Sequence, residues 1–150
     1  MEVENKLKAM GLELPAAGTP SPGRAGAVKV GNLLFVGGHT PGANFRGKLG
    51  ADITIEQGYE AARQTGLAIL SSLKREFGTL NNITAWLRAF GMVNVAPGFV
   101  QTPPVINGFS DLIIDVFGPE IGNHSRSAVG MAELPFGAPV EIEAEVEISL

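Results

Sequence analysis

The chain has 150 residues, a formal net charge of −4 and no cysteine. This length is enough for one domain with a sizeable hydrophobic core. The lack of cysteine excludes disulfides, thiolate metal ligands and a cysteine nucleophile. No apolar run is long enough to span a membrane, and the first residues include acids rather than an apolar signal segment. We therefore expect one cytoplasmic domain over residues 1–150, with no membrane partner.

The charge pattern also bears on nucleic-acid binding. Proteins that bind nucleic acids usually carry a basic patch for the phosphates. Here the 11 Lys and Arg residues are scattered and outnumbered by 15 Asp and Glu residues. A nucleic-acid partner is therefore disfavoured.

The first 26 residues are predicted to form a short N-terminal helix and an irregular arm. Residues 3–10 could form the helix, which would end at Gly11. Residues 14–26 are rich in Pro, Gly and Ala, a composition typical of irregular chain.

A tight β-hairpin is predicted next. Two strand-like runs, 27–30 and 33–36, flank the dipeptide Gly31-Asn32. A two-residue Gly-Asn loop between such runs favours a hairpin. Gly37-Gly38 then closes the second strand, where a backbone could approach a ligand closely.

A long helix and a strand follow. Thr54 and Gln57 form a capping-box pattern at the expected start of the helix, and Gly78 is expected to end it. Residues 83–93 are predicted to form a strand. Strict alternation would place Trp86 and Arg88 on one face, and Leu87 and Ala89 on the other.

A second helix is expected over residues 104–117, ended by Gly118-Pro119, and two last strands over 126–133 and 140–149. The predicted order is β-β-α-β-α-β-β. This order indicates an α+β fold with two helices packed on one face of a mixed sheet.

The last two predicted strands contain the strongest candidate site. Arg126 lies in a run of small residues, and Glu141, Glu143 and Glu145 alternate in the final strand. If the two strands pair, Arg126 and Glu141 can point into one cleft. A guanidinium binds a planar carboxylate through two parallel hydrogen bonds, and a nearby Glu can handle protons or position water. The pattern predicts a site for a small carboxylate ligand.

The same stretch resembles the RidA/YjgF family, also called the endoribonuclease L-PSP family. Arg126-Ser127, Leu134-Pro135 and then Glu141 match its C-terminal signature, and the resemblance extends from about Gly23 to Leu150. It implies a chorismate-mutase-like fold and a homotrimer with ligand clefts between subunits. It also implies a hydrolytic deaminase, without a cofactor, acting on reactive enamines and imines derived from amino acids.

The resemblance assigns roles to individual residues. Arg126 would bind the substrate carboxylate, and Glu141 would position the water that attacks the imine carbon. Gly37 and Gly38 match the small pair that lines the pocket with backbone N–H groups. Asn107 matches an Asn at the start of the second helix.

Two positions depart from the deaminase pattern. Ala128 stands where many deaminases have a Cys, and Arg24 stands where they have a pocket Tyr. Arg24 would remove a phenol from the ligand site and add positive charge. The cleft is therefore expected to be a variant one.

The two histidines, His39 and His124, could also reach the cleft, where a His can act as an acid or a base. A metal site is disfavoured, because neither HxH nor HxxxH spacing occurs. Both histidines could instead be loop residues with hydrogen-bonding roles.

Other interpretations stay open at this point. Arg126 could be solvated or paired with a Glu, and the alternating acids could simply face solvent. Besides a deaminase, the residues allow a non-catalytic module that binds a small carboxylate at the same cleft. Endoribonuclease activity, which the family name suggests, is disfavoured by the charge.

Overall fold

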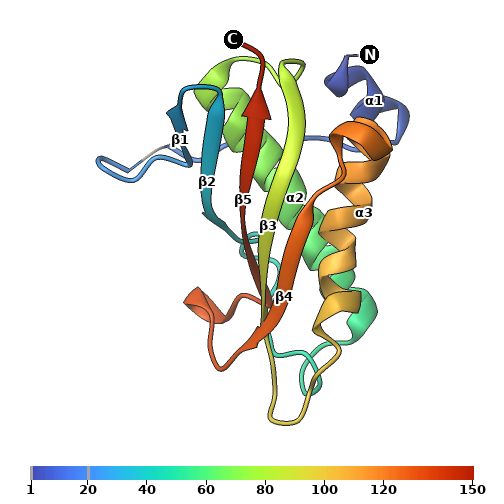
Figure 1. The fold of residues 1–150 in the computed structure, drawn as a ribbon. Coiled ribbons are helices and arrows are strands. Elements are labelled where there is room, and N and C mark those ends of the chain that lie inside the picture. Colours follow the sequence, from blue (N-terminus) through green and yellow to red (C-terminus); the bar gives the residue numbers. More distant parts are fainter. Residues whose placement is uncertain (1, 20) are drawn as a thin grey trace.

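The computed structural model describes residues 2–19 and 21–150, and its elements follow the predicted order (Figure 1). The elements, in chain order, are α1 (Val3–Ala9), β1 (Ala27–Val30), β2 (Leu33–His39), α2 (Ile55–Phe77), β3 (Ile83–Asn94), α3 (Thr102–Ile121), β4 (Ser125–Met131), a 3-10 turn (Pro135–Gly137) and β5 (Val140–Ile148). The predicted N-terminal helix and the hairpin around Gly31-Asn32 are confirmed.

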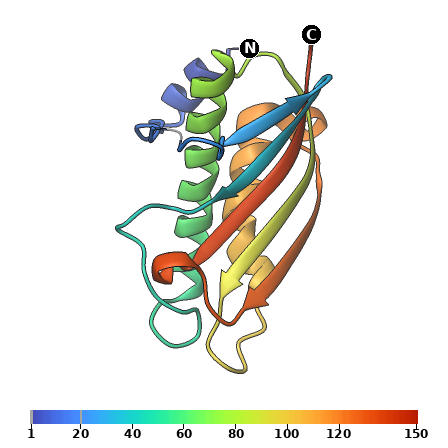
Figure 2. The ribbon, with the colours of Figure 1, turned by 90° about the vertical axis from the view of Figure 1, so that its left-hand side faces the viewer.

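The strands form one mixed sheet in the order β1-β2-β5-β3-β4. Only β3 and β4 run parallel, and the other neighbours are antiparallel. Helices α2 and α3 lie together on one side of the sheet, which leaves the other side uncovered (Figure 2). The predicted α+β fold is confirmed. We call the uncovered side, which carries Glu141, Glu143 and Glu145, the open face.

The hydrophobic core fills the space between the sheet and the two long helices. In β5 the residues Val140, Ile142, Ala144, Val146 and Ile148 are all buried, and the acids between them are half-buried. This period of two is typical of a strand with one face on a core. The acids therefore lie on the open face.

Helix α2 begins and ends where local sequence predicts. The Thr54 side chain accepts a hydrogen bond from the Gln57 N–H, and the Gln57 side chain accepts one from the Thr54 N–H. Gly78 ends the helix with φ of 80°, a left-handed conformation that glycine adopts without steric cost.

We expect Thr54→Ala to lower the free energy of unfolding by about 1 kcal/mol, because it leaves N–H groups of the first turn unpaired. Denaturant unfolding followed by circular dichroism measures this. Thr19→Ala, in the exposed arm, is the matched control and should change stability by less than about 0.5 kcal/mol. Equal effects of the two substitutions would contradict a capping role.

The prediction for the faces of β3 is wrong. Trp86 and Ala89 are both buried, and Leu87 and Arg88 are both exposed. The register against β5 shifts between Trp86 and Arg88, so one extra residue interrupts the alternation. This β-bulge directs both Trp86 and Ala89 toward the helices.

The ends of the last elements also differ from prediction. Helix α3 begins at Thr102, two residues early, and continues past Gly118 to Ile121 with a kink at Gly118, whose φ is 82°. Strand β4 ends at Met131, and it pairs with β3 rather than with β5. Strand β3 therefore separates the strands of Arg126 and Glu141.

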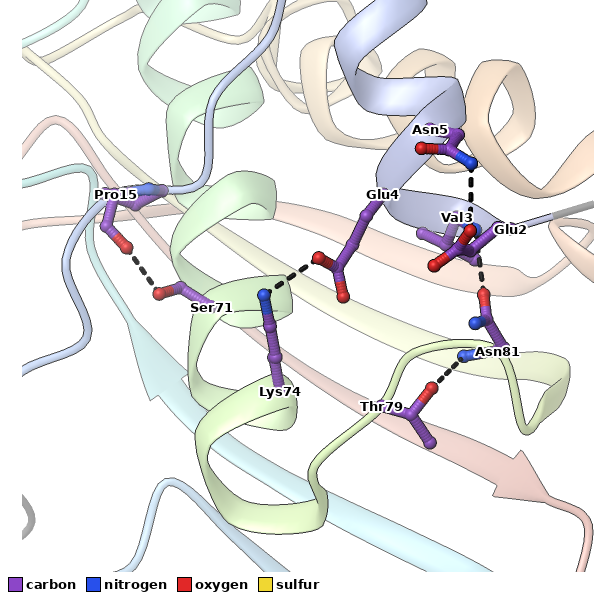
Figure 3. Close-up of polar contacts among 9 residues, drawn as sticks. All are labelled: Glu2, Val3, Glu4, Asn5, Pro15, Ser71, Lys74, Thr79 and Asn81. Carbon is purple, nitrogen blue, oxygen red and sulfur yellow. Dashed lines mark hydrogen bonds and ion pairs between the residues drawn. The ribbon is translucent and has the colours of Figure 1, made fainter.

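The N-terminal segment is attached to α2 and to the loop that follows it (Figure 3). Lys74 forms a 2.9 Å ion pair with Glu4, and the Val3 N–H donates to Asn81 Oδ1 at 2.8 Å. Further along, the Ser71 hydroxyl donates to the Pro15 carbonyl. These contacts carry the irregular arm along α2 toward the end of β2.

Candidate functional site

Arg126 lies on the edge strand β4 and faces α3. Its register partner in β3 is Ala89, which is buried under the helices. The guanidinium donates to Asn107 Oδ1 at 2.6 Å and to Ser110 Oγ at 2.9 Å, and more weakly to the Pro103 carbonyl at 3.4 Å. Sequence analysis predicted Arg126 and Asn107 as site residues, and the structure brings them into direct contact.

The partners of the Arg126 guanidinium are neutral. They are an amide oxygen, a hydroxyl and a carbonyl, and none of the ion pairs found among residues 2–19 and 21–150 includes Arg126. A guanidinium has five N–H donors. The three observed bonds therefore hold the group in place without cancelling its charge, and they leave two donors for an anion.

His124 lies behind Arg126 in the same cluster. Its Nδ1 is 2.7 Å from the Gly122 carbonyl, and its Nε2 is 3.0 Å from Ser110 Oγ. Its ring also packs edge-on against Phe109, with 5.8 Å between ring centroids. We call Arg126, Asn107, Ser110 and His124 the arginine cluster.

Glu141 lies on the other side of the sheet. It is opposite Met92 in β3 and alternates with the buried residues Val140 and Ile142, so its side chain is on the open face. The expectation that paired strands would bring Arg126 and Glu141 into one cleft is therefore wrong for a single chain. The strands do not pair, and the two side chains leave the sheet from opposite faces.

The carboxylate of Glu141 packs tightly against Gly38 at the end of β2. A Cβ added to Gly38 would lie 2.2 Å from Glu141 Oε2 and 3.0 Å from its carboxyl carbon. A glycine at this position lets the carboxylate lie directly over the backbone. The structure thus brings two predicted residues, Gly38 and Glu141, together in a second cluster.

Burial raises the pKa of Glu141, and the charge of neighbouring Glu143 raises it further. A carboxyl group with a raised pKa is a better general acid and base near neutral pH than an ordinary surface Glu. Perturbed pKa values of this kind gather at functional sites, although structural clusters produce them too.

The raised pKa also predicts a pH-dependent stability. Because the folded state disfavours the Glu141 carboxylate, the stability contributed by this group is greatest below its unfolded pKa and is lost as the pH rises through its folded pKa. We expect Glu141→Gln to raise the melting temperature at pH 7.5 and to have little effect at pH 4. Thermal unfolding at both pH values tests this. Glu120→Gln, at an exposed position, should show no such dependence. A Glu141→Gln effect that is the same at both pH values would contradict the prediction.

Within one chain, His39 lies apart from the arginine cluster. Its Nδ1 donates to the Gly37 carbonyl at 2.7 Å, and its Nε2 is 2.8 Å from Ser72 Oγ on α2. Burial lowers its pKa, so the imidazole is neutral at physiological pH and accepts the Ser72 hydroxyl proton. It lines a cavity of about 230 Å³ against the arm residues 15–18. The arm therefore covers His39 rather than Arg126.

The two departures from the deaminase pattern lie in different places. Ala128 is two residues after Arg126 on the same face, and its carbonyl accepts a hydrogen bond from Thr102 on α3 at 2.8 Å. Arg24 is exposed on a turn of the arm, bridged to Ser21. The missing thiol thus leaves a smaller side chain beside the arginine cluster.

A cavity of about 400 Å³ lies elsewhere, beside the start of α2, and is lined by Phe45, Arg46, Glu60 and their neighbours. Within the described part of the chain, no group of three or more His, Asp or Glu side chains is placed to hold a metal ion. No described helix is both long and apolar enough to cross a membrane.

Sequence analysis missed Ser110. It is buried, with only 9% of its surface exposed, and it touches both Arg126 and His124. The available signal was its spacing from Asn107, since residues three apart share a helix face. Two polar residues on an otherwise apolar helix face indicate a polar partner.

The chain is similar to known proteins along nearly its whole length. A family model described as "YjgF/chorismate mutase-like, putative endoribonuclease" matches residues 4–140. Protein TCP17 of Trypanosoma cruzi is 40% identical over 151 residues, covering 98% of this chain and 94% of that protein.

Two solved structures share both fold and sequence with it. The protein Atu1372 from Agrobacterium tumefaciens is 39% identical with a TM-score of 0.89, covering 98% of this chain and 92% of that one. A Shewanella oneidensis MR-1 protein that also carries an endoribonuclease description is 31% identical with a TM-score of 0.91, covering 99% and 100%. On the matched signature, the fold and these relatives, the chain belongs to the RidA/YjgF family.

Proposed function

We propose that this protein hydrolyses reactive enamines and imines derived from amino acids, releasing ammonia and a 2-oxo acid. The observation that carries the proposal is the state of Arg126. Its guanidinium is fixed by neutral acceptors, lacks an ion-pair partner among the described residues and keeps two N–H donors. Such a group is suited to bind a carboxylate.

Glu141 supplies the proton chemistry in this proposal. The protonated imine is attacked by water: the water oxygen bonds to the imine carbon, the C=N π electrons move to nitrogen, and the Glu141 carboxylate accepts one proton from the water. Glu141 then returns this proton to the nitrogen of the carbinolamine. The C–N bond breaks to release ammonia, and the hydroxyl proton passes to the carboxylate as the C=O bond of the 2-oxo acid forms. The raised pKa of Glu141 favours both transfers near neutral pH. The imine is already electrophilic, so the chemistry requires no cofactor.

The two groups would meet between subunits. They lie on opposite faces of one sheet, so Arg126 of one subunit and Glu141 of another would complete a cleft in the homotrimer that the family resemblance implies. The open face supports such an assembly, since it exposes the apolar side chains of Val28, Val30 and Phe35. Exposed apolar patches of this kind commonly mark interfaces.

The proposal is tested by imine hydrolysis. An amino-acid oxidase generates 2-iminopropanoate in the presence of semicarbazide, which traps the imine before it hydrolyses. An active protein diverts imine to pyruvate, which reacts more slowly with semicarbazide, and so lowers the initial rate of semicarbazone formation. We expect wild type and the control Arg63→Ala to do so, and Arg126→Ala to fail. An oligomer of normal size that leaves this initial rate unchanged would overturn the proposal for this substrate.

Ligand binding distinguishes a non-catalytic module from a deaminase. A module would bind 2-oxobutanoate through Arg126 without accelerating imine hydrolysis. Ribonuclease activity is disfavoured by the open face, where Glu141, Glu143, Glu145 and Glu147 form a row of carboxylates that would repel phosphates.

A further inference from the structure

Beyond Arg126 itself, we infer that Ser110 and His124 are positioning residues that orient Arg126 for carboxylate recognition. His124 directs the hydroxyl of Ser110, and that hydroxyl holds one arm of the guanidinium. This inference rests on the proposed function, in which Arg126 binds the carboxylate of the substrate. In this chain, Ser110 and His124 would thus hold the guanidinium of Arg126 in one orientation.

The geometry first fixes the imidazole of His124. A backbone carbonyl can only accept a hydrogen bond, so the 2.7 Å contact with Gly122 requires a proton on Nδ1. In the tautomer with this proton, Nε2 presents a lone pair toward Ser110 Oγ at 3.0 Å. The edge-on packing against Phe109 holds the ring from the side. The ring has little freedom to turn away.

The orientation of the Ser110 hydroxyl follows from these contacts. A serine hydroxyl carries one proton and two lone pairs. With its proton directed to His124 Nε2, its oxygen lone pairs remain for Arg126 Nη1, at 2.9 Å. Ser110 is buried, so water competes little for either bond. His124 thereby keeps Ser110 an acceptor for Arg126.

The consequence for a ligand is a pre-organised guanidinium. Asn107 Oδ1 holds the second terminal nitrogen, Nη2, at 2.6 Å, so both terminal nitrogens are held from α3. A side chain already fixed in its bound conformation loses less entropy when the ligand arrives. Because no partner in the arginine cluster is acidic, the full positive charge stays available to the ligand.

The experiment is a double-mutant cycle on ligand affinity. The probe is 2-oxobutanoate, titrated into the purified oligomer and followed by NMR to high concentration so that weak binding stays measurable. The proteins are wild type, Ser110→Ala, Arg126→Ala and the double variant. We expect Ser110→Ala alone to weaken binding on the order of tenfold, and to change nothing further once Arg126 is Ala. A purely structural role for Ser110 would weaken binding equally in both backgrounds, and that result would overturn the inference.

Further variants test the roles of Ser110 and His124 separately. They also show whether a loss of affinity comes from misfolding. Ser110→Thr keeps the hydroxyl and should retain affinity. His124→Phe keeps a ring against Phe109 but removes the lone pair, so it should weaken binding in the same direction as Ser110→Ala, with no added effect in the Ser110→Ala background. Full affinity in both Ser110→Ala and His124→Phe would also overturn the inference.

The cycle also separates this inference from the proposed function. If Arg126→Ala leaves the affinity for 2-oxobutanoate unchanged, or if the wild type does not bind it, the proposed carboxylate site fails and the inference fails with it. If Arg126→Ala weakens binding while Ser110→Ala does not, only the positioning role fails. The carboxamide 2-oxobutanamide, which lacks the negative charge, should bind poorly to every protein in the set.

Discussion

Subunits that carry Arg126→Ala and subunits that carry Glu141→Gln are expected to regain deaminase activity when they assemble together. Each variant alone should lose activity on the order of 100-fold or more, because one lacks the carboxylate-binding group and the other the proton-transfer group. The two side chains leave opposite faces of one sheet, so a cleft that uses both must draw on two subunits. A mixed oligomer can then contain a cleft with both wild-type groups.

The expected yield follows from symmetry. In a cyclic trimer with heterologous interfaces, any mixed trimer has one cleft in which the subunit with intact Arg126 meets the subunit with intact Glu141. Oligomers isolated with both kinds of subunit are all mixed, so their activity should return to roughly a third of the wild-type value.

The measurement is imine hydrolysis after co-expression of two differently tagged chains and isolation of oligomers that carry both tags. A matched control replaces the Arg126→Ala subunit by one that carries both substitutions, and this mixture should remain inactive. Mixed oligomers that are no more active than the parent variants would show that Arg126 and Glu141 do not share a cleft between subunits.

The second large effect is expected from Gly108→Ala. A Cβ at Gly108 would lie 1.9 Å from the backbone oxygen of Tyr59 on α2 and 3.1 Å from the backbone nitrogen of Arg63. These are backbone atoms of a packed helix, so α2 and α3 would have to move apart rather than adjust a side chain. We expect the free energy of unfolding to fall by about 3 kcal/mol.

Gly108 also lies next to the candidate site, because it follows Asn107, which holds the Arg126 guanidinium. Denaturant unfolding measures the stability. The matched control is Gly18→Ala, where an added Cβ meets nothing within 4 Å, and its effect should stay within about 0.5 kcal/mol. A Gly108→Ala protein as stable as the control would show that the two helices can separate at little cost.

Local patterns in the sequence predicted most of the fold correctly. The capping box at Thr54, the Gly78 helix end and the Gly31-Asn32 hairpin all depend on residues within a few positions of one another. Their geometry is determined by backbone conformation and by short-range hydrogen bonds. Such features are specified by the residues that form them, so they can be predicted without knowing which other segments pack against them.

The wrong predictions concern strand register and strand pairing, which depend on contacts between separate segments of the chain. The bulge between Trp86 and Arg88 follows from the register of β3 against β5, which strict alternation within β3 cannot reveal. The pairing of β4 with β3 likewise depends on how α3 crosses the sheet. Sequence motifs indicated Arg126 and Glu141 as site residues, but not that they occupy opposite faces.

The order of the elements, the ends of α2 and the chemical types of the site residues can be predicted from the amino-acid sequence, because they depend on neighbours along the chain. The position of Ser110 between His124 and Arg126, and that of Gly38 against Glu141, follow from the three-dimensional fold. Both contacts join different elements, α3 with β4 in one case and β2 with β5 in the other. Packing of helix on sheet and strand on strand creates them, and no local pattern specifies which side chains will meet.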